Sequence, residues 1–395
     1  MCAGLQTTYA MEKKIEDTRL GIIPALHEVG AKLQEAIQEN GAQNNTFCAM
    51  GVVQTLGMLH TIADSSIQSE IEAFTNNNEL TSHLIDLNNQ LTAHSKPIQS
   101  ERDEKKKYIL TNGAYALITF NQTFNESCLP KIKAVGAQLH VVDFCNATEA
   151  AAKINGIVKR DTNGKIEEIL SASAFTPNAA CVLLHTLYVN ASFKETFAQG
   201  FMDFKDALGK RTEVKSLTSD EARLDLYKKK DTKIALFKTL GKCELFIRHS
   251  PTSVRLISME DMKNFATKSK NVKLKKLQVP FISLQTTIDL KGKLSTHLPN
   301  TLNTTFQTEL LSDPISVSDY IQKVTFDMTN SGVEASAATA LLCQIESCMD
   351  HRKKAIETFV VDSPFTFLLT KTIAGQRVPL FHGQVINASV MKTEE

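Results

Sequence analysis

The feature that most constrains the fold is a long connection near the C-terminal end, residues 332–354, between two segments of strand-like composition. Residues 324–328 before it and 365–370 after it are both predicted strands. Connections between neighbouring elements usually span only about 2–6 residues. A connection this long indicates either a functional loop or a disordered one.

The composition of this connection favours a segment that can enter a sheet. Residues 335–342 are small or apolar and carry no charge. In a strand, side chains alternate between two faces, so one face would carry only uncharged side chains and Glu334 would point the other way. That face holds Val333, Ala335, Ala337, Thr339, Leu341 and Cys343. An exposed loop able to become a buried strand stores conformational energy. The alternative is a short Ala-rich helix, because Ala is the best helix former.

The rest of the chain predicts helices first and strands later. Helical apolar spacing covers residues 22–37, 52–62, 67–74 and 80–91, and a further helix is expected at 148–158. The continuous apolar run 181–189 predicts a central strand buried on both faces. Other strands are expected at 108–118, 139–144, 233–237, 244–248, 253–258, 274–284, 324–328, 365–370 and 380–386. With no repeat and no Gly/Ser/Pro-rich linker, one α+β domain is expected.

Charge and composition exclude several classes of partner. The chain has 44 basic and 43 acidic residues, a net charge of +1, so no global field attracts nucleic acid or an anionic membrane. It contains no apolar stretch long enough to span a membrane, and residues 1–9 lack the pattern of a secretory leader. We therefore expect a soluble, leaderless chain without nucleic-acid or membrane partners.

Motifs for metals, cofactors and catalysis are absent from the sequence. The eight cysteines form no C-x-x-C pair, and most are expected to be small buried hydrophobes. G-x-S-x-G, H-E-x-x-H, G-x-G-x-x-G and Walker A patterns do not occur. We predict no enzyme activity, metal site or cofactor.

Three lysine-rich runs, 105–107, 228–230 and 268–276, are expected to be solvated faces or turns. The third run, KSKNVKLKK, also fits weak binding of a sulfated polysaccharide.

The segment GVEASAATA at 332–340 resembles the hinge signature of the serpin family. FVVDSPFTFLL at 359–369 and PLFHGQVIN at 379–387 resemble that family's C-terminal strand pair, and TNGKI at 162–166 resembles the turn after its sixth helix. The resemblance runs along the whole chain in order. It implies a single serpin domain over 1–395, with early helices packed on three β-sheets and an exposed reactive-centre loop at about 330–358.

By this resemblance the loop is presented to a serine protease as a substrate. The enzyme attacks a loop carbonyl, forms an acyl-enzyme, and is trapped when the cut loop inserts into the large sheet. The implied hinge consists of Gly332, Val333, Glu334, Ala335, Ser336, Ala337, Ala338, Thr339 and Ala340.

Counting from Gly332 as inhibitory serpins do places the reactive bond between Glu346 and Ser347. A glutamate there indicates a target protease with a basic specificity pocket, because a buried carboxylate needs a cation. Neighbouring bonds as far as Met349 are alternatives, and a trypsin-like target would require Arg352 or Lys353. Cys343 and Cys348 flank the bond, either as free thiols or as a disulfide.

Several positions depart from the family pattern. Near Asn45, the family's two shutter serines correspond to Ala49 and Val52, and the Asn and His that join them correspond to His185 and Gln322.

Two further departures lie near the hinge, where Asn330 replaces an acidic residue and Phe193 replaces a tryptophan. The departures leave open a non-inhibitory serpin with a carrier, chaperone or storage role. Cross-class inhibition of a cysteine protease is a further alternative.

The expected assembly is a monomer. Seven Asn-x-Ser/Thr sequons and the habit of the family favour an extracellular protein whose leader was removed, whereas a naturally leaderless chain favours the cytoplasm.

Overall fold

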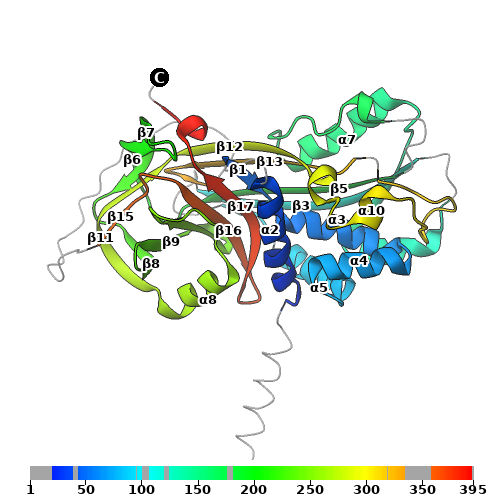
Figure 1. Cartoon of the computed structure of the whole chain (residues 1–395), viewed down its shortest axis with the longest axis horizontal. Coiled ribbons are helices and arrows are strands. Elements are labelled where there is room, and N and C mark those ends of the chain that lie inside the picture. The colour runs from blue at the N-terminus through cyan, green and yellow to red at the C-terminus, as the bar shows by residue number, and fades with distance from the viewer. Residues whose placement is uncertain are drawn as a thin grey trace, which may run out of the picture.

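The computed structural model describes residues 20–38, 43–94, 96–99, 106–119, 124–175, 181–317, 319–333 and 357–393. The early helices lie together against one face of a sheet that contains β3 and β5, and α7 lies on the opposite face (Figure 1). The strands of residues 198–280 lie in the other half of the molecule, with α8 (Met259–Lys268) on their outer side.

The four helices predicted in the first third are confirmed. They are α2 (Ile22–Gln38), α3 (Ala49–Ile62), α4 (Ser65–Thr75) and α5 (Leu80–His94). Helix α3 is buried along its whole length. Helix α4 begins where the Asp64 side chain accepts hydrogen bonds from the backbone N–H groups of Ser66 and Ile67, and it ends at Asn76 in the left-handed conformation.

The remaining α-helices are α6 (Leu129–Ala134), α7 (Ala147–Asp161), α8 (Met259–Lys268), α9 (Leu290–Leu294) and α10 (Pro299–Asn303). Short 3₁₀ turns occur at Glu126–Cys128, Ala172–Ala174, Leu240–Lys242 and Ala388–Val390. Helix α7 matches the prediction at 148–158 and is capped by the Asn146 side chain, which accepts from Glu149 N.

Seven strands form the first sheet, in the order β12-β13-β14-β5-β3-β2, with β4 paired to β3. Their bounds are β2 (Ile98–Gln99), β3 (Lys107–Thr119), β4 (Ala137–Val142), β5 (Cys181–Ser192), β12 (Ile282–Asp289), β13 (Ile321–Thr329) and β14 (Gly332–Val333). Strand β14 is thus the central element, although it is only two residues long.

Ten strands form a second network, in which β15 pairs β11 and the others follow the order β1-β17-β16-β10-β9-β8-β11-β7-β6. Two sheets join here through β11, because its first half pairs with β8 and its second half with β7 and β15. The bounds are β1 (Asn45–Phe47), β6 (Ala198–Lys205), β7 (Arg211–Ser219), β8 (Arg223–Lys229), β9 (Thr232–Lys238), β10 (Cys243–His249), β11 (Lys270–Pro280), β15 (Glu357–Val360), β16 (Phe365–Ile373) and β17 (Gln376–Val385).

Two strand predictions were wrong. Residues 253–258 form no strand, because the Ser253 and Arg255 carbonyl oxygens accept from the side chains of Arg248 and Thr366 instead of a neighbouring strand, and Ser258 is the N-cap of α8. The predicted strand 274–284 is two strands, β11 and β12, which separate at Phe281 after Pro280. Pro280 lacks an N–H group to donate to a ladder, which favours this break.

The buried apolar residues form one large cluster and two smaller ones. The large cluster lies between the early helices and both sheets, one small cluster lies under α7, and the other lies between α8 and β8–β10. In the described parts of the chain, no helix is long and apolar enough to cross a membrane.

Candidate functional site

The first two residues of the predicted hinge, Gly332 and Val333, form a strand inside the large sheet. Val333 pairs with Met328 of β13 on one side and with Ala191 of β5 on the other. Gly332 has a φ of +152°, and a Cβ added to it would lie 2.5 Å from the Ala191 carbonyl oxygen, so the position requires glycine. Strands bonded to the same neighbour lie two spacings apart, so β14 holds β5 and β13 roughly 9–10 Å apart.

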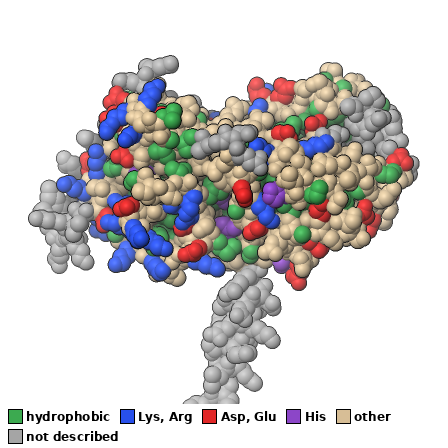
Figure 2. Space-filling view, viewed as in Figure 1, with side chains coloured by type: hydrophobic (Ala, Val, Ile, Leu, Met, Phe, Trp, Pro, Cys, Tyr) green, Lys and Arg blue, Asp and Glu red, His purple; other side chains and the backbone are tan. Residues whose placement is uncertain are grey.

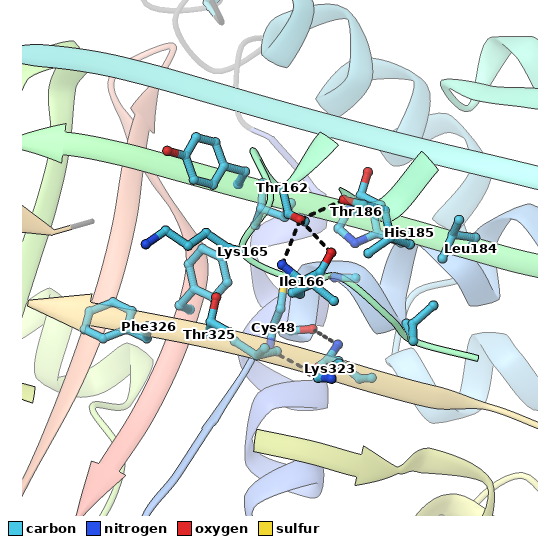
Figure 3. A pocket seen from close by; sticks show the side chains of 18 of the residues that line it. Cys48, Thr162, Lys165, Ile166, Leu184, His185, Thr186, Lys323, Thr325 and Phe326 are labelled. Atoms are coloured by element: carbon cyan, nitrogen blue, oxygen red, sulfur yellow. Dashed lines mark hydrogen bonds between the residues drawn. The ribbon is translucent and has the colours of Figure 1, made fainter. Parts of the chain in front are cut away.

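Beyond Val333 the sheet contains a slot. Within the described residues, β5 and β13 have no direct strand pairing, and the ladders that hold them run to β3 and β12 on their far sides. A cavity of about 90 Å³ lies between them (Figure 3). We call this feature, with its walls 183–189 on β5 and 321–327 on β13, the β5–β13 slot. Facing strand edges that lack a ladder are a template for one more strand.

The slot explains why one expectation about β5 failed. Residues 181–189 were predicted to be buried on both faces, but Val182, Leu183, His185 and Leu187 are only half-buried. The continuous apolar sequence is typical of a central strand with a neighbour on each side. In the described structure β14, the neighbour of β5 on the side of the slot, reaches only as far as Val333.

Gln322 of β13 closes the floor of the slot against the start of α3. Its amide oxygen accepts from Cys48 N and its amide nitrogen donates to Cys48 O, both at 2.9 Å. Cys48 is the N-cap of α3, with its thiol accepting from Gly51 N at 3.3 Å. Burial raises the pKa of the Cys48 thiol to about 12, so the group stays neutral and unreactive at pH 7.

His185 of β5 forms the facing part of the floor. Its Nε2 pairs with Asn112 Oδ1 of β3 at 2.9 Å. Burial lowers the pKa of His185 to about 4, so the ring is neutral at pH 7. A Cβ on Gly51 would lie 2.8 Å from His185 Nδ1 and 3.2 Å from Gln322 Nε2, so only glycine leaves room for both side chains.

Farther along, Tyr320 reaches α3 beneath the slot. Its hydroxyl lies 2.5 Å from Thr55 Oγ1 and 3.3 Å from the Val52 carbonyl oxygen. The Tyr320 and Thr55 hydroxyl groups thus find hydrogen-bond partners in each other. Gln322, Cys48 and His185, the other polar groups of the floor, carry no charge at pH 7. The floor therefore suits an uncharged strand of small side chains.

The end of α7 and the segment after it lie over the slot, and together they contact both walls. Lys165 Nζ is 3.9 Å from Asp327 of β13, and Lys323 of β13 donates to Glu168 O at 3.0 Å. On the other wall, Thr186 of β5 donates to the buried Asp161 carboxylate at 2.7 Å. A strand that fills the slot would lie between this segment and α3.

Two positions that depart from the family pattern anchor the turn before β14. The backbone N–H of Phe193 donates to Ser331 O at 2.9 Å, and the Asn330 side chain donates to Phe197 O at 3.2 Å. Phe193 is fully buried and packs edge-on against Phe197 at 5.4 Å. The turn that delivers the loop to the sheet is therefore firmly attached.

The structure brings some of the predicted shutter residues together and not others. His185 and Gln322 face each other across the floor of the slot, whereas Ala49 and Val52 are fully buried in α3 and do not line the cavity. Asn45 lies on β1, where it pairs with Gln384 of β17. The residues missed were Cys48, Gly51, Thr55 and Tyr320. The first three repeat every three to four positions along one helix face, which could have identified them.

The other predicted hinge residues, 334–340, and the predicted reactive bond Glu346–Ser347 lie outside the described residues. Cys343, Cys348 and Met349 lie outside them as well. Among the cysteines whose side chains are described, Cys48, Cys128 and Cys243 are buried and free, as predicted for most, and Cys145 is exposed.

Comparisons with known proteins agree with this geometry. The family model described as serpin (serine protease inhibitor) matches residues 25–388. Serpin-ZXA of Oryza sativa subsp. japonica is 27% identical over 296 residues, which cover 69% of this chain and 72% of that protein. Leukocyte elastase inhibitor of Sus scrofa is 27% identical over 292 residues, covering 65% and 74%.

The crystal structure of native protease nexin-1 with heparin superposes with a TM-score of 0.75 at 17% identity, covering 94% of this chain and 99% of that one. At this identity the superposition shows the fold alone. The family match extends over most of the chain, and the chain belongs to the serpin family.

Proposed function

We propose that this protein is a suicide inhibitor of a serine protease, which it traps by inserting its cleaved loop into the β5–β13 slot. The observation that carries the proposal is β14, because the hinge already occupies the start of the slot in register with both walls. The chain that follows Val333 needs only to continue as the same strand.

The register of Val333 assigns a place to each inserted residue. Ala335 would lie between Val189 and Phe326, Ala337 between Leu187 and Val324, and Thr339 between His185 and Gln322. Because side chains alternate, these residues would face α3 with Val333, which is buried in the large apolar cluster. Small uncharged residues at 335, 337 and 339 fit the neutral floor beneath them.

Insertion would release free energy through two contributions. The unpaired edges of β5 and β13 would gain a ladder on each side of the new strand, and the inward side chains would be buried. Each buried methylene contributes about 0.8 kcal/mol. A protease bound covalently to the cut end would be carried along the sheet before it could complete hydrolysis.

The proposed reactive bond remains Glu346–Ser347, and the proposed target is a serine protease that prefers an acidic residue before the cut bond. A target with a cationic specificity pocket would pair the Glu346 carboxylate. The alternative is a non-inhibitory serpin, whose loop a protease would cleave without becoming trapped in a stable complex.

The test is to mix the protein with glutamyl-, aspartyl-, arginyl- and leucyl-selective proteases and to resolve the products on a denaturing gel. We expect an SDS-stable complex with a glutamyl-selective enzyme and release of a peptide that starts at Ser347. Cleavage of the loop by every enzyme of the panel without a stable complex would contradict the inhibitor proposal. A complex whose released peptide starts elsewhere would contradict only the Glu346 assignment.

A further inference from the structure

A second cavity, of about 110 Å³, lies beside the start of β5. Its walls come from α3, α10, the first residues of β5 and the segments 169–175 and 315–321. Helix α3 contributes Leu56, Leu59 and Ile62, which are three residues apart and lie near one another on one side of the helix. Figure 1 shows α3, α10 and this end of the sheet in the same half of the molecule. We call this feature the α3–α10 cavity.

The α3–α10 cavity lies where two apolar clusters of the core meet. Its α3 residues, together with Leu302 and Ile315, belong to the large cluster. On the other side, Leu184 belongs to the cluster under α7, and four half-buried side chains pack against that cluster: Ile169, Leu170, Phe175 and Val182. Protein interiors are close-packed, so a cavity of this size between two apolar clusters is a candidate binding site.

The lining of the α3–α10 cavity offers few hydrogen bonds to water. The hydroxyl groups of Thr55 and Tyr320 are paired with each other, and the Thr301 hydroxyl donates to the Glu70 carboxylate. Among the described residues that line the cavity, no buried side-chain oxygen or nitrogen lacks a hydrogen-bond partner. A buried water needs about two to four polar partners, so this cavity favours apolar contents.

The charges around the α3–α10 cavity favour an uncharged ligand. Its described lining residues include no Lys or Arg, and Asp319 is the one carboxylate among them. Asp319 is exposed, so it would repel an anion and give a cation little stabilisation in water. Figure 2 shows Lys and Arg side chains gathered on the other half of the molecule, with few over the half that contains α3 and α10 in Figure 1.

We propose that the α3–α10 cavity binds a small uncharged apolar molecule of about the size of one aromatic ring. An engineered cavity of about 150 Å³ lined by Leu, Ile and Phe binds benzene in another protein. The α3–α10 cavity is smaller, but it adjoins the cavity of about 90 Å³ in the β5–β13 slot. The two cavities share Thr55, Ile169, Leu183, Leu184, Tyr320 and Ile321. Together they suit a ring with a short substituent, such as toluene.

The shared wall connects this site to the loop insertion proposed above, on which this consequence rests. In the register set by Val333, Leu341 would lie between Leu183 and Tyr320, and both of these residues line the α3–α10 cavity. A bound ligand and an inserted Leu341 would therefore compete for the same apolar surface. Because coupling between two sites is reciprocal, the ligand should oppose insertion, and insertion should weaken ligand binding.

The binding test is calorimetric titration of the full, uncut chain with toluene. We expect a dissociation constant of roughly 0.1–1 mM, which lies within the usual affinity per atom for so small a ligand. Ala174→Phe adds a ring at a residue that lines the cavity and should weaken binding by about tenfold or more. The control is Ala172→Phe, at a half-buried position of the same 3₁₀ turn that does not line the cavity, and it should bind like the wild type.

A second variant tests the site by gain of binding. Leu170→Ala enlarges the cavity, so it should bind naphthalene about tenfold more tightly than the wild type does. Equal weakening of toluene binding by the two Phe substitutions would overturn the proposal. Benzoate, which adds a carboxylate to the same ring, should not bind, and binding as tight as that of toluene would also overturn the proposal.

The link to insertion is tested separately with protein that has been cut once in the loop. This form should bind toluene about tenfold more weakly than the uncut chain. Unchanged affinity in cut protein whose unfolding midpoint has risen would contradict the link. The titrations of uncut protein involve no protease, so the cavity proposal and the inhibitor proposal can each fail alone.

Discussion

Gln322 of β13 and Cys48 at the start of α3 are joined by two hydrogen bonds of opposite direction, both 2.9 Å long. This pair of hydrogen bonds between the Gln322 side chain and the Cys48 backbone fixes the floor of the β5–β13 slot to the first turn of α3. Between the described strands β5 and β13 the sheet can thus contain the slot without leaving these buried polar groups unpaired.

Gln322→Ala should lower the free energy of unfolding by about 1–3 kcal/mol, because the Cys48 N–H and C=O groups lose their partners. Urea unfolding measures this change. Gln285→Ala, at an exposed position of β12, is the matched control and should change stability by less than about 0.5 kcal/mol. Equal effects of the two substitutions would show that the contact with Cys48 contributes nothing.

Two helical glycines offer a test of the space under His185. Gly51→Ala in α3 should destabilise the protein, because the added Cβ would lie 2.8 Å from His185 Nδ1. Gly156→Ala in α7 should stabilise it by about 0.5–1 kcal/mol, since the added Cβ meets nothing within 4 Å and alanine favours helix. Thermal unfolding of both variants checks the signs, and stabilisation by Gly51→Ala would contradict the packing described.

Stability should fall in acid because of two neighbouring histidines, the buried His382 and the half-buried His27. His382 is 2% exposed and stacks on Phe47, and its ring centroid is 6.4 Å from that of His27. Burial lowers the pKa of His382 to about 3 and that of His27 to about 4. The unfolded chain protonates near pH 6.5. It therefore binds more protons than the folded chain between pH 6.5 and these lower values, and stability is lost as pH falls through this window.

His382→Phe should reduce this acid sensitivity. Between pH 7 and pH 4.5 the variant should lose about 2 kcal/mol less stability than the wild type, at roughly 1.4 kcal/mol per pKa unit. Urea unfolding at both pH values measures the difference, and His94→Phe, at an exposed position, is the control. An unchanged pH dependence in His382→Phe would refute the assignment.

The alternation of faces in the inserted loop can be tested by one pair of neighbouring substitutions. Ala337→Asp would place a carboxylate against the apolar side of the sheet between Leu187 and Val324, which is costly without a partner. Ala338→Asp would place the same charge on the face toward α7. We expect Ala337→Asp to convert the inhibitor into a substrate, with cleavage but no SDS-stable complex, whereas Ala338→Asp keeps most complex formation. Equal behaviour of the two variants would contradict the register.

Much of the fold was readable from local pattern. Apolar spacing predicted α2 to α5, and β-branched or apolar runs predicted β3, β5, β9, β10, β13 and β16. The failure at residues 253–258 has a tertiary cause, because the Ser253 and Arg255 carbonyl oxygens accept from the side chains of Arg248 and Thr366, which strand propensity does not reveal.

The site was predicted only in part, because its floor depends on which residues the sheet places over α3. His185 and Gln322 were found through the family pattern, but their partners Asn112 and Cys48 lie 73 and 274 positions away along the chain. Spacing within one segment cannot reveal such pairs. Nor does it reveal that, among the described residues, β14 reaches only as far as Val333 and the β5–β13 slot lies beyond it.

The most direct test of loop insertion compares thermal unfolding before and after one cut in residues 340–350 by a protease that the protein does not trap. Insertion would bury four or five inward side chains, contribute several kcal/mol, and raise the unfolding midpoint by roughly 5 °C or more. The account predicts this rise for the wild type and its absence for Ala337→Asp. An unchanged or lowered midpoint in the cut wild type would contradict insertion into the β5–β13 slot.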